Sequence, residues 1–174
     1  MGVTAGPAEW WTSTPDGIDS MAISCPLGTV LPDGSAVICR AGGAAWIVAP
    51  FCTEVTQTWN GTTNTQVLDQ PCVTSWSTLC STMIACGFNP SKWFVPSVSQ
   101  LQNPGYLCRD KWDNYCSSCV YWSSTEVNAS VICSQLAACF VYFSNGIATS
   151  CFGGGVLNTK VCSLKVRAFR CVNY

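Results

Sequence analysis

The sequence contains no histidine, and this absence removes the commonest acid–base side chain from the chain. Without it neither a Ser-His-Asp triad nor a Cys-His pair can form, and no Gly-x-Ser-x-Gly elbow is present either. A pair of carboxylates is conceivable, such as Asp110 with Asp113 or Glu126. Because the chain has nine acidic residues among 174, chance proximity explains such pairs equally well. We therefore expect a protein that is not an enzyme.

Charge is also scarce. Charged residues make up 10% of the chain, against about 25% in an average soluble domain. The eight lysines and arginines are scattered and the net charge is −1, so no basic stripe is available for phosphates and nucleic acid is not an expected partner. No apolar run approaches the roughly 20 residues of a membrane-spanning helix, since the longest, 44–52, is interrupted by Pro50. We expect no membrane insertion.

Cysteine, in contrast, is abundant: 14 of 174 residues, about 8%, which is the level of disulfide-stapled secreted proteins. Residues 1–7 have neither a basic n-region nor an apolar h-region, so we expect no signal peptide. Both observations fit a protein that is assembled in a reducing cytoplasm and later released into an oxidising medium, as virion proteins are. They fit equally a chain whose cysteines are small buried hydrophobes with free thiols. Both interpretations stay open.

The chain reads as one domain, residues 25–174, preceded by an N-terminal segment, residues 1–24. The N-terminal segment contains Trp10-Trp11 and a turn-like composition at 13–17. We expect it to be an arm that docks onto a larger assembly, with a segment tucked against its own domain as an equal alternative.

Local patterns predict a mixture of strands and short helices. The predicted strands are a hairpin over 29–39 with its turn at 32–35, a strand over 45–49, a hairpin through Asn145-Gly146, and a single long strand over 161–172. Apolar residues recur at helical spacing between 73 and 84, and Ser97 with Gln100 has the spacing of a capping box. The second helix should stop before 103–105.

Four short motifs occur in a recognisable order: Trp-x-x-Pro-Ser at 93–97, Tyr-Trp-Ser-Ser-Thr-Glu at 121–126, Phe-Ser-Asn-Gly at 143–146 and Val-Arg-Ala-Phe-Arg-Cys-Val at 166–172. The chain thereby resembles the C-terminal domain family of the Legionella collagen-like adhesin and the C-type-lectin-fold domains of phage receptor-binding and fibre proteins. The resemblance covers roughly residues 72–174. Phe94 and Val95 stand where the family usually has Arg-Leu, and the surplus of cysteines is not a family trait.

The resemblance implies a C-type-lectin-like α+β fold, with two short helices, a small twisted antiparallel sheet and long loops. It implies that the motif residues pack mainly as scaffold, although Tyr121 to Thr125 could also be read as a binding edge, because aromatic rings stack on sugars. The expected scaffold residues are Trp93, Pro96, Tyr121, Trp122, Ser123, Ser124, Arg167 and Arg170.

Ligand binding is expected on loops, which carry function while a scaffold positions them. The loops between 127 and 138, between 145 and 160 and around Trp112 are the candidates, and the expected contact residues are Trp112, Asp113, Asn114, Asn128 and Asn145.

Two clusters raise the question of a metal. The oxygens of Asp110, Asp113 and Asn114 make Ca²⁺ a minority expectation. The paired motifs of calcium-dependent lectins are echoed only in the wrong order, and isolated surface acids are usually just solvated. Cys116-Ser117-Ser118-Cys119 has the spacing of a zinc or redox motif, but it lacks a second ligand pair and a βαβ context. A structural role, bridged or simply buried, is expected for it.

The leading functional expectation is a phage protein on the virion surface that decorates the head or forms a fibre tip. Its partners would be other virion proteins in a multimeric assembly and a glycan or protein on the host surface. A cell-surface adhesin module that binds glycans is the alternative. A third class, an enzyme of the formylglycine-generating type, would need a copper-binding cysteine pair.

Overall fold

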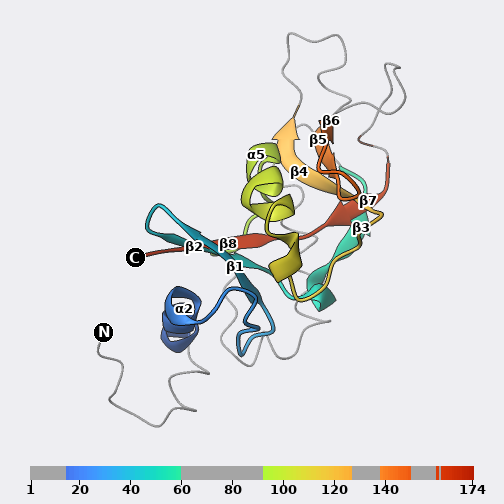
Figure 1. Ribbon diagram of the computed structural model, residues 1–174. Helices are drawn as coiled ribbons and strands as arrows, with labels where there is room; N and C mark the ends of the chain where they lie inside the picture. The colour runs from blue at the N-terminus through green and yellow to red at the C-terminus, as the bar shows by residue number, and fades with distance from the viewer. Residues whose placement is uncertain (1–14, 60–91, 127–137, 150–159, 161) are drawn as a thin grey trace.

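A computed structural model describes residues 15–59, 92–126, 138–149, 160 and 162–174, which fold as an α+β domain with two sheets (Figure 1). The helical elements are α2 (Pro15–Ser24), η1 (Phe51–Thr53), α5 (Val98–Gln100), η3 (Leu101–Tyr106) and η4 (Arg109–Lys111). The strands are β1 (Ala36–Ala41), β2 (Ala44–Val48), β3 (Val55–Gln57), β4 (Val120–Glu126), β5 (Ala138–Tyr142), β6 (Ala148–Thr149), β7 (Leu164–Val166) and β8 (Phe169–Asn173). No helix among these residues is long and apolar enough to cross a membrane.

The smaller sheet, with strand order β1-β2-β8, joins the first hairpin to the last strand. Gly42 and Gly43 both have positive φ, 60° and 75°, and this lets the chain reverse between β1 and β2. The turn predicted at 32–35 forms, with Gly34 N–H donating to the Leu31 carbonyl at 2.8 Å. The two arms predicted around it pair through one isolated bridge, Val30 with Ala36, and through backbone hydrogen bonds of Val37 with Gly28 and Thr29.

Residues 15–24 form a helix, although 13–17 has the composition of a turn. Proline fits the first turn of a helix, where its missing N–H costs nothing. Helix α2 buries Ile18 and Ala22 in the core, and Asp19 forms an ion pair with Arg170 of β8. This part of the expected docking arm therefore packs against its own domain. Residues 1–14 lie outside the described residues.

The larger sheet has the order β3-β7-β4-β5-β6 and is not wholly antiparallel, because β4 and β7 run parallel, with Tyr121 opposite Lys165. The fold expected from the sequence has one sheet that is antiparallel. The prediction is wrong in both respects, because the structure has two sheets and the larger one contains a parallel pair. The predicted hairpin through Asn145-Gly146 is confirmed between β5 and β6, and Gly146 has a φ of 76°.

The long strand predicted over 161–172 is two strands in different sheets. Strand β7 belongs to the larger sheet and β8 to the smaller one, and Arg167 and Ala168 form the crossing. The crossing is held where Ala49 N–H donates to the Ala168 carbonyl at 2.9 Å and Arg167 Nε–H donates to the Ala49 carbonyl at 2.7 Å. Strand β7 ends at this point because the Arg167 side chain binds partners in a buried polar cluster.

The predicted capping box is confirmed: Ser97 Oγ accepts from Gln100 N–H, and Gln100 Oε1 accepts from Ser97 N–H. The predicted stop before 103–105 is confirmed, because Asn103 has a non-helical backbone with φ −142° and ψ 111°, and a separate wide turn of π type follows it. Leu107 N–H reaches the carbonyl of Gln102, and Pro104 has no N–H to leave unpaired. The helix predicted over 73–84 lies outside the described residues.

Candidate functional site

The sequence motifs meet in space. Phe94 and Phe169 exchange a pair of backbone hydrogen bonds of 2.9 and 2.8 Å, and Ser124 N–H donates to the Pro96 carbonyl at 2.9 Å. Ser123 Oγ donates to the Cys139 carbonyl at 2.7 Å. Backbone and side-chain bonds thus join segments that are distant in the chain, and most of the expected scaffold residues are buried. The buried ones are Trp93, Pro96, Tyr121, Trp122, Ser123, Arg167 and Arg170, while Ser124 is half-buried.

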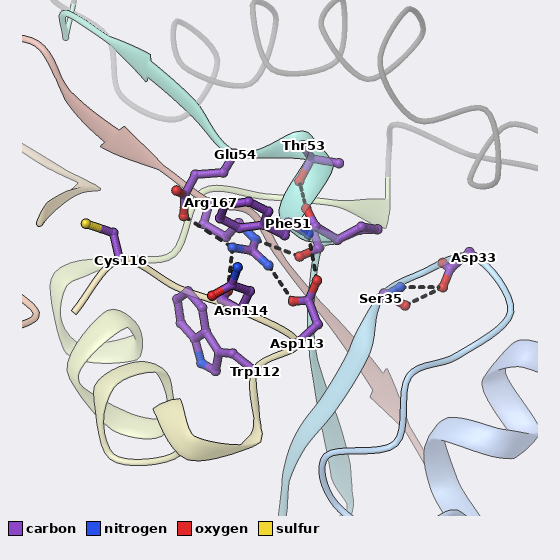
Figure 2. Close-up of polar contacts among 12 residues, drawn as sticks. Asp33, Ser35, Phe51, Thr53, Glu54, Trp112, Asp113, Asn114, Cys116 and Arg167 are labelled. Carbon is purple, nitrogen blue, oxygen red and sulfur yellow. Dashed lines mark hydrogen bonds and ion pairs between the residues drawn. The ribbon is translucent and has the colours of Figure 1, made fainter.

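Arg167 is the centre of a buried polar cluster (Figure 2). Its residue exposure is 1%. The guanidinium donates to the carbonyls of Ala49 and Asn114, at 2.7 and 2.9 Å, and to two carboxylates. The rings of Phe51 and Trp112 lie 5.5 and 5.4 Å from its central carbon, within cation–π range. The charge is therefore compensated by acids, carbonyls and aromatic faces.

The two carboxylates are Glu54 and Asp113. Glu54 Oε1 accepts from Arg167 at 3.2 Å and from the Tyr121 hydroxyl at 2.5 Å, and its side chain is 4% exposed. Asp113 accepts from Arg167 at 2.5 Å through Oδ1 and from Phe51 N–H at 2.8 Å through Oδ2. Both acids are thus engaged in holding η1, the segment at 112–114 and the β7–β8 crossing together.

The three calcium candidates have different surroundings in the structure. Asp113 forms an ion pair with Arg167. Asp110 lies on the surface, where its Oδ2 is 3.6 Å from Lys111 Nζ. Asn114 contributes its backbone carbonyl to Arg167. Among the residues that the structure describes, no group of three His, Cys, Asp or Glu is placed to hold a metal ion.

The residues expected to contact a ligand differ in their exposure to solvent. Trp112 is 6% exposed, packs edge-on against the rings of Tyr115, Tyr121, Phe143 and Phe169, and donates from Nε1 to the Gly105 carbonyl, so its expected surface role is wrong. Asn145 is exposed, and its Oδ1 accepts from Ile147 N–H at 2.9 Å, which stabilises the β5–β6 turn. Asn114 is exposed, and Asn128 lies outside the described residues.

Tyr121 links the polar cluster to the Cys116–Cys119 segment. Burial, together with the hydrogen bond to Glu54, raises the pKa of the Tyr121 phenol well above its usual range. The hydroxyl stays protonated, so it can donate to Glu54 while it accepts from Cys116 N–H at 3.0 Å. The cluster is a set of satisfied hydrogen bonds rather than a poised acid or base.

The cysteines divide into bridged and free. Cys116 and Cys119 form a disulfide, and Cys52 is disulfide-bonded as well. Among the other described cysteines, Cys25, Cys39, Cys108, Cys162 and Cys171 are free thiols. Burial and the neighbouring Cys39 raise the pKa of the Cys108 thiol to about 11. Among the described cysteines some are therefore bridged and others are not, and both interpretations of the cysteine content stay predictions.

Strands β4, β5 and β6 bring Glu126, Ala138 and Thr149 to the same end of the larger sheet. Glu126 lies opposite Ala138, and Thr149 lies opposite Phe140. The chain thus leaves the sheet at Glu126 and Thr149 and re-enters it at Ala138, side by side. Helix α2 and the C-terminus lie away from this end (Figure 1).

Glu54 is the residue that sequence reasoning missed. It lies in a Thr- and Gln-rich stretch, and its distance of more than 100 positions from Arg167 gives no local signal. The only available clue was the arginine itself, since a charge inside an apolar strand requires a partner. Comparison of the sequence with models of protein families and with characterised proteins finds no match. The resemblance to C-type-lectin-like domains rests on its motifs.

Proposed function

We propose that the chain is a display module on the surface of a phage particle, built as a C-type-lectin-like domain that presents recognition segments at one end of a packed scaffold. The observation that carries the proposal is the meeting of Glu126, Ala138 and Thr149 at one end of the larger sheet. Loops that a rigid scaffold positions commonly bind ligands.

The way the motif residues are used supports a scaffold role. Trp122 Nε1 donates to the Gln57 carbonyl at 3.0 Å, and Trp59 Nε1 donates to the Ser123 carbonyl at 3.0 Å. These polar atoms bind backbone groups of other strands, which favours a packing role over a catalytic role for this motif.

Placement on a particle is supported by the order of the motifs and by the mixture of disulfides and free thiols, which suits a chain that passes from a reducing to an oxidising medium. The test is mass spectrometry of purified particles from the source, followed by immunogold labelling. We expect the chain to be a stoichiometric component, labelled on the head shell or at fibre tips. Its absence from every particle fraction would overturn the proposal.

A glycan array separates this proposal from a cell-surface adhesin module. An adhesin predicts saturable binding to a glycan by the isolated protein together with location on cells rather than on particles. Glycan binding by a chain that is found on particles would instead identify the receptor of a fibre tip.

A further inference from the structure

We propose that Cys116–Cys119 is an exchangeable disulfide, a site where a low-molecular-weight thiol such as glutathione attacks Cys116 and releases Cys119. This inference is independent of the particle proposal.

The location of the disulfide makes it accessible. Cys116 and Cys119 are half-exposed, and Ser117 and Ser118 between them are exposed. The bridge closes a loop with only two intervening residues, so it removes less chain entropy from the unfolded state than a long-range disulfide does. Exposed disulfides are typically the labile ones, whereas buried structural disulfides resist reduction by glutathione.

The segment holds its shape without the bridge. Cys119 N–H donates to the Cys116 carbonyl at 3.2 Å, and Phe143 N–H donates to the Cys119 carbonyl at 2.9 Å. Cys116 N–H donates to the buried Tyr121 hydroxyl at 3.0 Å. These three bonds fix both cysteines from the backbone, so reduction should leave the two thiols side by side and ready to close again. This is the property that a reversible exchange site needs.

The two sulfurs differ in their surroundings. Cys119 packs against the buried apolar cluster that contains Trp112, Tyr121 and Phe143, and Cys116 does not. The Ser118 hydroxyl lies 3.7 Å from Cys116 Sγ, close enough to donate a weak hydrogen bond to a thiolate at that position. Cys116 is therefore the sulfur open to attack and, in the reduced protein, the better nucleophile. Cys119 is the resolving thiol.

The exchange takes place in two steps. An incoming thiolate forms a bond to Cys116 Sγ, the Cys116–Cys119 bond breaks, and the electron pair leaves on Cys119 Sγ, which takes a proton from water. A second thiol molecule, as its thiolate, then attacks the small-molecule sulfur of the mixed disulfide. Cys116 leaves with the electron pair and takes a proton from water. In sum, two thiols are oxidised to one small disulfide, and the protein disulfide is reduced to two thiols. The same small disulfide drives the reverse reaction.

The full chain would be equilibrated in glutathione buffers of increasing reduced-to-oxidised ratio, quenched with acid, alkylated and mapped by mass spectrometry. We expect Cys116 and Cys119 to become reduced together in a buffer that leaves the circular dichroism spectrum unchanged. Reduction of Cys116–Cys119 only in denaturant would overturn the proposal. This titration uses the unaltered protein, so it does not depend on how any variant folds.

Matched variants assign the roles. Cys119→Ser should accumulate a glutathione adduct on Cys116, because the resolving thiol is missing. Cys116→Ser should form much less adduct, on its remaining Cys119. Equal trapping by both variants would contradict the assignment of Cys116. In the reduced protein, Ser118→Ala should slow alkylation of Cys116 by iodoacetamide at neutral pH, and Ser117→Ala serves as the control. Equal rates in the two serine variants would remove the role assigned to the Ser118 hydroxyl.

Discussion

Arg167 is the residue on which the arrangement depends most. Its guanidinium joins η1, the segment at 112–114 and the crossing between the two sheets, and it is almost completely buried. A buried ion pair contributes little net stability compared with an apolar core, but removing one partner is costly because a charge is then left unpaired. The value of Arg167 thus lies in the geometry that it imposes.

Replacing Arg167 by methionine should lower the free energy of unfolding by about 3–5 kcal/mol, because Glu54 and Asp113 lose their shared cation. Urea denaturation would measure the loss. Lys111→Met is the control, since Lys111 pairs with Asp110 at the surface and should cost less than about 1 kcal/mol. Equal losses in the two variants would show that the buried cluster does not hold the sheets together.

Alkaline pH should destabilise the fold through Cys108. Its pKa is raised from 9.0 to about 11 in the folded protein, so the folded state holds the thiol proton more tightly than the unfolded state does. This contribution to stability is complete below about pH 9 and is lost as the pH rises through about 11. The fall in the urea midpoint should be shallower in Cys108→Ala. Parallel pH profiles of the two proteins would contradict this.

The sequence predicted local features more reliably than long-range ones. The capping box at Ser97 and the Asn145-Gly146 turn are correct, because each depends on residues within four positions of one another. The break at Arg167 could not be predicted, because it depends on Glu54 and Asp113, which are far away in the chain. Trp112 was misjudged for the same reason, since its burial is created by rings from β4, β5 and β8 and their neighbours.

Helix α2 belongs to the domain rather than to a separable arm. Its position follows from a short apolar face and from the ion pair between Asp19 and Arg170. The helical spacing of Ile18, Met21 and Ala22 was a usable sequence signal, but the turn-like composition before it obscured the signal.

Ile18→Ala should therefore cost about 2–5 kcal/mol, as removal of a buried aliphatic side chain does. Ser24→Ala, at the exposed end of the same helix, should stay within about 0.5 kcal/mol of the natural chain in the same urea assay. A neutral Ile18→Ala would mean that α2 is an independent arm after all.

Two turn glycines can be compared, Gly146 between β5 and β6 and Gly42 between β1 and β2. A Cβ on Gly146 would lie 2.5 Å from the Tyr106 ring, whereas a Cβ on Gly42 meets nothing within 4 Å, and both residues have positive φ. Gly42→Ala should show the backbone cost alone, about 1 kcal/mol, and Gly146→Ala should cost a further ~1–3 kcal/mol through crowding. Thermal unfolding of both variants measures the difference, and identical melting temperatures would exclude close packing at Tyr106.

The molecule as a whole has two different ends. Helix α2 and the C-terminus lie at one end, and the end of the larger sheet where β4 ends and β5 begins lies at the other (Figure 1). A display module attached to a particle needs this polarity, with one end for attachment and the other for contact. The small sheet, in which the first hairpin pairs with the last strand, packs against α2.

The central claim is that this chain is a surface display module, and cryo-electron microscopy of purified particles tests it most directly. We predict density for this domain on the head shell or at a fibre tip, with α2 toward the particle and with the end of the larger sheet where β4 ends and β5 begins directed outward. Density in the reverse orientation, or particles that contain none of this chain, would contradict it.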